Sequence, residues 1–437
     1  MQQFLRNRTF SVLAITSGTL AYSFGQWLVL IMLARQASKE DVGFFSLALA
    51  ICAPISLLMG LSLRTVFLTD MHDKRYFGDF LFLRIAGSVL TIVLSLAYAI
   101  ITGVYSAIFV SVVLCKAIDL VTDIFCAPLQ EKNQLWRVGL QSGLNGSIGA
   151  ATVALCLYTL KTSPEIAILS RIAGSVVALI STAIHNPDFP VTPRLNKIRP
   201  ILRIAWPMGI SAMVVSLLPN IPRYILNSYV SIESVGVFSA VAYLTIIGTT
   251  VVSAVAQLFL PRLVKLYHAQ GRAALHRMVT NLVTIMGSIG VLATILSTFL
   301  AEPLLEFFYG KDYNDQTTFI VLMAAWALGA VGWMYDLGLS TKRLFRAQLA
   351  SSAIAVVFVL ISSLLMIPMW HTLGAAYATL VGAIVQLISR IAFFTHETWP
   401  TKEEFSSKDS KESTEPSGHT QQTDAKPYKQ NMEEGAS

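Results

Sequence analysis

Charged residues inside one apolar stretch are the first candidates for chemistry in this sequence. The segment LCKAIDLVTDIF places Lys116, Asp119 and Asp123 at positions i, i+3 and i+7, which share one face of a helix. Charges are expensive in hydrocarbon, so this face must meet protein or a watery cavity. Asp119 can neutralise Lys116, which leaves Asp123 without a partner. Repulsion between the two acids favours protonation of one of them. Asp119 and Asp123 are therefore candidates for H+ or Na+ coupling, with a purely structural polar stripe as an equal alternative.

Arg223 is a candidate ligand for an anion. It follows Pro219 and Pro222 in LLPNIPRYILNSY, toward the end of a long apolar stretch. Prolines free backbone carbonyls and bend helices, and such a bend can bring the arginine toward a central cavity. Arginine binds phosphate and carboxylate groups through two parallel hydrogen bonds. Snorkelling of the side chain to the membrane surface is the alternative.

Other cations extend this candidate site. Arg171 lies inside another apolar stretch, and Lys116 is the cation described above. Arg64 and Arg84 fall close to one membrane surface, where snorkelling to lipid head groups explains them at least as well. We expect Arg223, Arg171, Lys116, Arg64 and Arg84 to be substrate-binding candidates.

Other chemistries find less support in the sequence. Asp336 is expected to face water or to pair with Lys342 or Arg343 rather than to act in coupling. The sequence holds no GxxxxGK[ST] loop for a nucleotide, so the energy source is expected to be an ion or substrate gradient. Four cysteines lie in apolar stretches without metal-ligand spacing, and they predict neither zinc nor disulfides. We therefore expect no cofactor, and no catalytic or metal site.

The elements that must position these residues are membrane-spanning helices. The 437-residue chain is 54% hydrophobic and 13% charged, with a mean hydropathy of +0.62, which excludes an ordinary soluble domain. Runs of roughly 20 apolar residues, enough to cross about 30 Å of hydrocarbon as a helix, recur along the chain. We count twelve, at about 10–34, 43–68, 80–102, 104–128, 138–160, 164–184, 201–229, 236–260, 279–300, 317–339, 347–369 and 372–394. The fold class is thus an all-α polytopic membrane protein.

The distribution of lysine and arginine predicts the orientation, because these residues favour cytoplasmic loops. If both ends of the chain are cytoplasmic, four cations remain in the outer loops, Arg35, Lys39, Lys161 and Lys311. The inner segments then hold Arg6, Arg8, Lys74, Arg75, Arg84, Lys132, Arg137, Arg194, Lys197, Arg199, Arg203, Arg262, Lys265, Arg272, Arg277, Lys342, Arg343 and Arg346. This topology and anionic lipids explain the net charge of +7 without nucleic acid.

A repeat divides the chain. SKEDVGFFS at 38–46 and SIESVGVFS at 231–239 share six identical residues at a constant offset of 193, each where a second helix begins. We predict an N-lobe of six spans at 1–184 and a C-lobe of six spans at 201–395, with the substrate site between them near mid-membrane. The proline-rich and basic stretch at 185–200 reads as a cytoplasmic linker, and 396–437 as a disordered cytoplasmic tail.

Several stretches in order resemble the oligosaccharide flippases of the Wzx type, in the multidrug/oligosaccharidyl-lipid/polysaccharide exporter superfamily. The resemblance covers almost the whole apolar region and places Arg64, Lys116, Asp123 and Arg223 on positions where that family also has polar or charged residues. The matching stretches are LSLRTVFLTDMHDKRYFGDFLFLR, KAIDLVTDIFCAPLQEKNQLWR, NIPRYILNSYVSIESVGVFSAVAYL, LPRLVKLYHAQG and LLEFFYGKDY. Twelve expected spans differ from the fourteen of lipid II flippases, which argues against a peptidoglycan precursor.

The resemblance implies a function and a location. A protein of this family moves undecaprenyl-diphosphate-linked oligosaccharide from the inner to the outer leaflet of the bacterial cytoplasmic membrane by alternating access. It is not an enzyme, and its expected partners are the lipid-linked oligosaccharide and the membrane, with a polymerase and a chain-length regulator of the pathway also allowed. O-antigen, capsule and exopolysaccharide all remain open as products. Sugar specificity is expected from residues such as Gln26, Asn145, Tyr224, Asn227 and Trp333, with helix packing as an equal alternative.

Two other functions remain as alternatives. A cation-coupled multidrug exporter of the same fold would need acids for cationic drugs, whereas several intramembrane charges here are arginines. The first expected span also lacks the aspartate that many such exporters have. A membrane-embedded polymerase or glycosyltransferase would need a sizeable outer loop, and the longest one expected, around 301–316, is short.

Overall fold

Helices are the only regular secondary structure of the described residues. The computed structural model describes residues 2–69, 77–184 and 195–396, and no strand occurs within them. The expected tail lies outside these residues except for His396, as does 185–194 of the expected linker. The elements are α1 (Gln2–Gln36), α2 (Lys39–Gly60), α3 (Leu63–Thr69), α4 (Phe77–Thr102), α5 (Ala107–Glu131), α6 (Leu135–Ala154), the π-helix η1 (Leu155–Thr159), α7 (Pro164–Ser170), α8 (Ile172–Ala183), α9 (Leu195–Tyr229), α10 (Ile232–Tyr243), α11 (Thr245–Tyr309), the 3-10 helix η2 (Lys311–Tyr313), α12 (Gln316–Thr341) and α13 (Phe345–Thr395).

Many of these helices can cross a membrane. Eight described stretches are long and apolar enough by length and composition. Two of them, with 62 and 51 residues, lie in α11 and α13 and are far longer than one crossing needs. Each contains a residue with non-helical dihedral angles, Gly271 and His371, so each is two helices joined at a break. The prediction of an all-α, multi-pass membrane protein is confirmed.

The number of crossings and the side of the termini stay predictions. Twelve crossings require that α11 and α13 each cross twice, at the breaks just described, and that α5 and α6 also cross. The apolar stretch of α5 contains Lys116, Asp119 and Asp123, which is why its composition alone does not mark it as a span. One boundary differs from expectation: α9 begins at Leu195, inside the expected linker.

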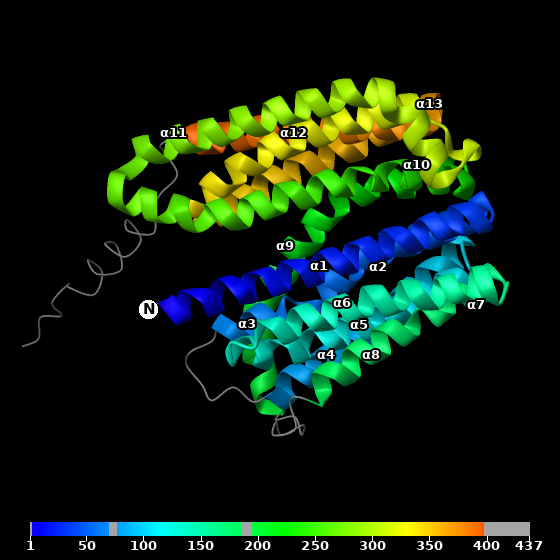
Figure 1. The fold of residues 1–437 in the computed structure, drawn as a ribbon, viewed down its shortest axis with the longest axis horizontal. Helices are drawn as coiled ribbons and strands as arrows, with labels where there is room; N and C mark the ends of the chain where they lie inside the picture. Colours follow the sequence, from blue (N-terminus) through cyan, green and yellow to red (C-terminus); the bar gives the residue numbers. More distant parts are fainter. Residues whose placement is uncertain (1, 70–76, 185–194, 397–437) are drawn as a thin grey trace, which may run out of the picture. The chain divides into compact units, whose positions relative to one another are not determined.

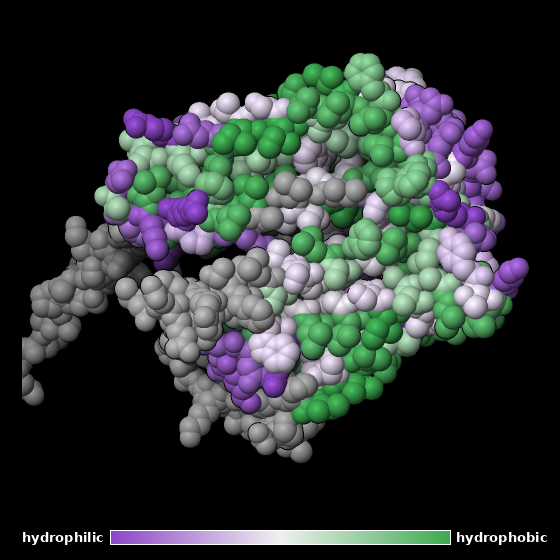
Figure 2. Space-filling model, viewed as in Figure 1, coloured by the Kyte–Doolittle hydropathy of each residue, from purple (hydrophilic) through white to green (hydrophobic). Residues whose placement is uncertain are grey.

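The described surface suits a lipid environment. Large apolar side chains such as Ile101, Phe299 and Leu365 are exposed, at a cost in water that hydrocarbon would remove. Figure 2 shows hydrophobic residues across the middle of one face and hydrophilic residues gathered toward its two ends. This is the pattern of an apolar belt between two polar surfaces.

Helix packing brings distant segments together (Figure 1). In the first part of the chain, α1 packs along α6, and α5 contacts α2, α4 and α8. In the last part, α11 packs along α12, and Gly338 of α12 lies against the Phe394 ring of α13. Contacts of α2 with α9 and α10 join the two parts. The residues that line any space between these helices therefore come from both repeats.

The repeated motif forms equivalent helix entries. Ser38 caps α2 by accepting a hydrogen bond from the Asp41 amide at 3.1 Å, and Ser231 caps α10 by accepting one from the Ser234 amide at 3.2 Å. The ends of the preceding helices, α1 at Gln36 and α9 at Tyr229, are related by the same offset of 193. The same capping interaction thus fixes where the second helix begins in both copies of the repeat.

The two copies of the motif also contact each other reciprocally. A Cβ atom on Gly43 would lie 2.1 Å from the Ile232 carbonyl oxygen, and one on Gly236 would lie 2.5 Å from the Lys39 carbonyl oxygen. Lys39 and Ile232 occupy equivalent positions of the repeat, as do the two glycines. Such an exchange is the signature of a two-fold relation. Only glycine leaves room for backbones this close.

Candidate functional site

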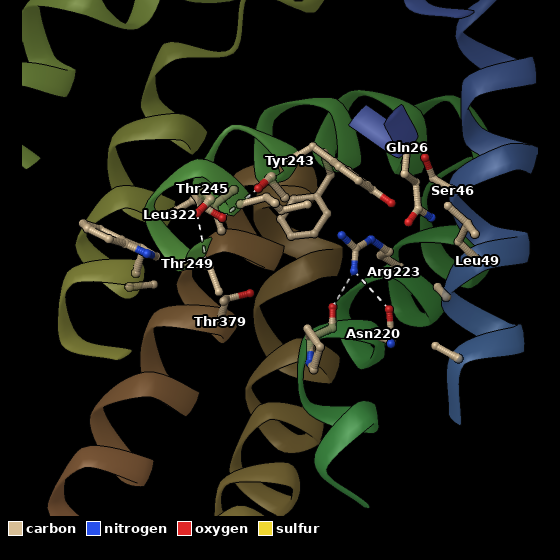
Figure 3. Close-up of a pocket in the computed structure, with 18 of the residues that line it drawn as sticks. Gln26, Ser46, Leu49, Asn220, Arg223, Tyr243, Thr245, Thr249, Leu322 and Thr379 are labelled. Atoms are coloured by element: carbon tan, nitrogen blue, oxygen red, sulfur yellow. Dashed lines mark hydrogen bonds between the residues drawn. The ribbon is translucent and has the colours of Figure 1, made fainter. Parts of the chain in front are cut away.

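A cavity of about 520 Å³ lies among helices from both repeats. Its lining comes from α1, α2 and α5 and from α9 to α13 (Figure 3). Two of its lining residues are cations, Lys116 and Arg223, and none of the lining residues is acidic. A cavity of this size holds a small organic ligand or one part of a larger ligand. Its charge favours an anion.

Arg223 reaches this cavity from α9. Its Nε donates to Ser239 Oγ at 3.0 Å, and its Nη1 donates to the Pro219 carbonyl at 2.8 Å and to Asn220 Oδ1 at 3.1 Å. The guanidinium carbon lies 5.8 Å from the centre of the Phe238 ring. These neutral partners orient the group, and no carboxylate of the described residues lies within 4 Å of it. The positive charge therefore remains available to a bound anion.

Lys116 lines the same cavity and belongs to a hydrogen-bonded network next to it. Its Nζ donates to the Tyr22 hydroxyl at 2.9 Å and lies 4.0 Å from Asp119 Oδ2. The hydroxyl of Tyr22 donates in turn to Asp119 Oδ2 at 3.1 Å. Asn145 and Ser175 each donate to Asp119 Oδ1 at 2.7 Å. All three side-chain groups donate to Asp119, as an ionised carboxylate requires.

Arg171 adds a second cation to this network. It lies between α7 and α8, is buried at 4% exposure, and interacts electrostatically with Asp119 and Tyr22. A Cβ atom on Gly149 would lie 3.1 Å from the Arg171 Cγ, so the glycine makes space for the side chain. Lys116, Arg171 and Asp119 together leave a net positive charge in a largely buried environment. Arg171 does not line the cavity itself.

Arg64, Arg84 and Asp123 form a separate cluster. Asp123 Oδ1 accepts from Arg64 Nη1 at 3.1 Å, and its Oδ2 accepts from Arg84 Nη2 at 2.9 Å. Arg64 also donates to Gln130 Oε1 through Nε at 3.1 Å and Nη2 at 2.8 Å. The expectation that Asp123 is left over is wrong, because tertiary packing brings it two cations. Snorkelling does not describe Arg84, which is 2% exposed.

A break after α2 positions this cluster. Leu61 and Ser62 have positive φ angles of 52° and 47°, which end α2 and start the short helix α3 that bears Arg64. A Cβ atom on Gly60 would lie 2.8 Å from Arg84 Nη1, so the glycine admits the buried guanidinium. A broken helix next to charged groups is common at transporter sites.

The seven predicted residues thus divide among three places. Arg223 and Lys116 meet at the cavity, Lys116 also joins Asp119 and Arg171, and the Asp123 cluster stands apart from the cavity lining. The roles of these residues stay predictions.

The sequence did not predict several residues that contact the candidate site residues. Tyr22 and Ser239 were not predicted, because neither a tyrosine nor a serine stands out in an apolar helix. Asp336 pairs with Arg390 at 3.0 Å and not with Lys342 or Arg343, which corrects that expectation. The isolated arginine in VQLISRIAFF, Arg390, was the sequence feature that could have indicated this partner for Asp336.

The expected specificity residues have mixed outcomes. Gln26 lines the cavity, whereas Asn145 serves the Asp119 network and the Tyr224 hydroxyl donates to the Ala50 carbonyl. Trp333 is partly buried against the apolar cluster of α11 and α12 and is not part of the lining.

Comparison with solved structures identifies the class of fold. The chain is similar over 91% of its length to lipid II flippase MurJ in an inward closed conformation, with a TM-score of 0.68, 12% identity and 89% of that chain covered. It is similar over 92% of its length to a multidrug resistance MATE family transporter of the MOP superfamily in an inward-facing conformation, with a TM-score of 0.66, 14% identity and 100% of that chain covered. The chain therefore has the fold of these two transporters, as the sequence resemblance implied.

Within that class, the family follows from the sequence. The model of a family described as polysaccharide biosynthesis protein (Polysacc_synt_3) matches residues 32–318, and the chain belongs to this family. A curated relative is the capsular polysaccharide biosynthesis protein CapF of Staphylococcus aureus, 26% identical over 379 residues, which are 84% of this chain and 94% of that protein.

Proposed function

We propose that this protein is a flippase that moves undecaprenyl-diphosphate-linked oligosaccharide repeat units from the inner to the outer leaflet of a bacterial cytoplasmic membrane. The observation that supports it most is Arg223, a guanidinium that lines a cavity between the repeats with no acidic partner among the described residues. A diphosphate crossing hydrocarbon needs such a partner, since an unpaired anion there is expensive. Lys116 at the same cavity adds a second positive charge.

Membership of a polysaccharide biosynthesis family supports the same substrate class. Capsule, O-antigen and exopolysaccharide all need such a step, and a polymerase and a chain-length regulator would then receive the product. Alternating access between an N-lobe at 1–184 and a C-lobe at 201–395 provides the movement. Energy would come from H+ or Na+ coupling at Asp119 or Asp123, with Arg171, Arg64 and Arg84 as further anion-binding candidates.

No specific observation favours either alternative function. A cationic drug would meet two cations and no acid in the cavity lining. A polymerase would need a catalytic segment outside the membrane, whereas only Gly310–Asp315 separates α11 from α12. Residues 301–309, expected in that loop, complete α11 instead.

Substitution of Arg223 tests the proposal. Cells carrying Arg223→Ala should accumulate lipid-linked repeat units on the cytoplasmic leaflet and lose surface polymer, whereas Arg223→Lys should partly restore both. Arg262→Ala is the matched control, because Arg262 is exposed and lies outside the cavity lining. Protein abundance is measured for each variant. Normal polymer in Arg223→Ala cells at normal abundance would reject the proposal.

A further inference from the structure

The cavity has two chemically different sides. Arg223 and Lys116 provide positive charge, whereas α11, α12 and α13 contribute Thr245, Thr249, Thr379 and the indole of Trp326. Figure 3 shows the three threonines gathered on one side, with Arg223 lying away from them toward Gln26 and Ser46. One ligand that fills this space would therefore meet cations at one end and neutral groups at the other.

The three threonines present hydrogen-bond acceptors to the cavity. Each hydroxyl donates to a carbonyl of the helical chain: Thr245 to Ala242 at 2.8 Å, Thr249 to Thr245 at 3.0 Å, and Thr379 to Ala375 at 2.9 Å. A hydroxyl has one donor and two lone pairs, so only acceptor capacity remains for a ligand. These groups suit a ligand that offers O–H donors and suit a phosphate poorly.

Trp326 adds an aromatic surface beside these acceptors. A Cβ atom on Gly248 would lie 2.5 Å from Cε2 and Cζ2 of the indole and 2.9 Å from its Nε1. Any side chain larger than hydrogen at Gly248 would therefore displace the ring. An indole offers a flat apolar face and a polar edge together.

We propose that the wall formed by Thr245, Thr249, Trp326 and Thr379 binds the sugars next to the diphosphate of the lipid-linked substrate. A sugar ring combines C–H faces, which pack on an aromatic ring, with hydroxyl donors, which match the threonine acceptors. The inference rests on the proposed function, since the anionic end of the same ligand lies at Arg223. The cavity of about 520 Å³ has room for only the first sugars of a repeat unit. This wall then selects substrates by their first sugars.

Binding of two lipids to the purified protein tests this subsite. The probes are undecaprenyl diphosphate and the same lipid carrying one N-acetylhexosamine. Trp326→Ala should weaken the sugar-bearing lipid at least about tenfold and leave the sugar-free lipid within about twofold. Trp326→Phe, which keeps a flat ring, should recover part of the loss. Thr249→Val keeps the side-chain shape and should weaken the sugar-bearing lipid about threefold.

Controls separate this inference from the proposed function. Trp370→Ala removes an exposed tryptophan that is not part of the cavity lining, and should change neither affinity. Arg223→Ala should weaken both lipids equally, because both carry the diphosphate. Equal loss of both lipids in Trp326→Ala, or no loss of either at unchanged melting temperature, overturns the sugar subsite. No effect of Arg223→Ala on either lipid would instead overturn the diphosphate site.

Discussion

At the scale of single residues, pairing decides what a buried charge can do. Asp123 forms ion pairs with both Arg64 and Arg84, so its negative charge is already fully compensated. Arg223 has only neutral partners among the described residues, which leaves its charge for a ligand. The sequence predicted that these groups leave the lipid-facing surface, because a charge in hydrocarbon is expensive. It could not predict their pairing, which depends on how helices distant in the chain pack.

Asp119 is the acid whose protonation would most directly affect the cavity. It is bonded to Tyr22, which in turn accepts from the cavity-lining Lys116, so loss of its charge would weaken the hold on that lysine. We expect Asp119→Asn to remove stimulation of translocation by an imposed H+ or Na+ gradient, while lipid binding is kept. Translocation in proteoliposomes with and without each gradient measures this.

Asp123→Asn is the comparison for this prediction. It leaves Arg64 and the buried Arg84 without their shared anion, as Asp119→Asn does for Lys116 and Arg171, so we expect both variants to lower the melting temperature. Gradient stimulation should remain in the fraction of Asp123→Asn protein that folds. Full stimulation in Asp119→Asn protein would remove Asp119 from the coupling step.

At the scale of elements, the apolar stretches predicted the helices well. They predicted only some of the turns between helices. The break at His371 falls between the stretches expected at 347–369 and 372–394, since a helix that must leave the membrane needs a turn there. The break at Leu61 and Ser62 was not predictable, because neither residue favours a positive φ angle. Tertiary contacts hold that conformation, and a single sequence does not show them.

One such turn permits a stability prediction. Arg343 joins α12 to α13 at a φ angle of 59° and is exposed. Arg343→Gly should stabilise the protein by about 0.5–1 kcal/mol, because glycine adopts this conformation without strain. Arg346→Gly, in the first turn of α13, removes the same charge where glycine relieves no strain, and should not stabilise the protein. Melting temperatures in detergent compare the two, and a lower value for Arg343→Gly would contradict the argument.

At the scale of the whole molecule, contacts between the repeats join the last turns of α1 and α11. Trp27 Nε1 donates to the Tyr309 hydroxyl at 2.9 Å, and Arg35 Nε donates to the Phe308 carbonyl at 3.0 Å. A second nitrogen of Arg35 donates to the Phe307 carbonyl, so α1 caps the last turn of α11. By the predicted orientation, this end faces outward. Release of a substrate to the outer leaflet would require these contacts to separate.

A reversible bridge across this end tests the requirement. Arg35→Cys and Phe307→Cys place thiols on two exposed positions, while the four native cysteines are buried. Linking the pair with a short disulfide-forming reagent should stop translocation and preserve lipid binding, and a reductant should restore translocation. Each single-cysteine variant treated with the same reagent is the control. Translocation at the normal rate through bridged protein would show that this end need not open.

The reciprocal contact of Gly43 and Gly236 has a consequence for directionality. Two identical subunits related in this way would present every cavity residue twice, and a cavity lined so would treat both ends of a ligand alike. Joining the repeats in one chain removes that restriction: by the offset of 193, Arg223 corresponds to the buried Leu30, and Tyr243 corresponds to Ala50. The two copies differ at both positions. A polar ligand can therefore bind in a single orientation.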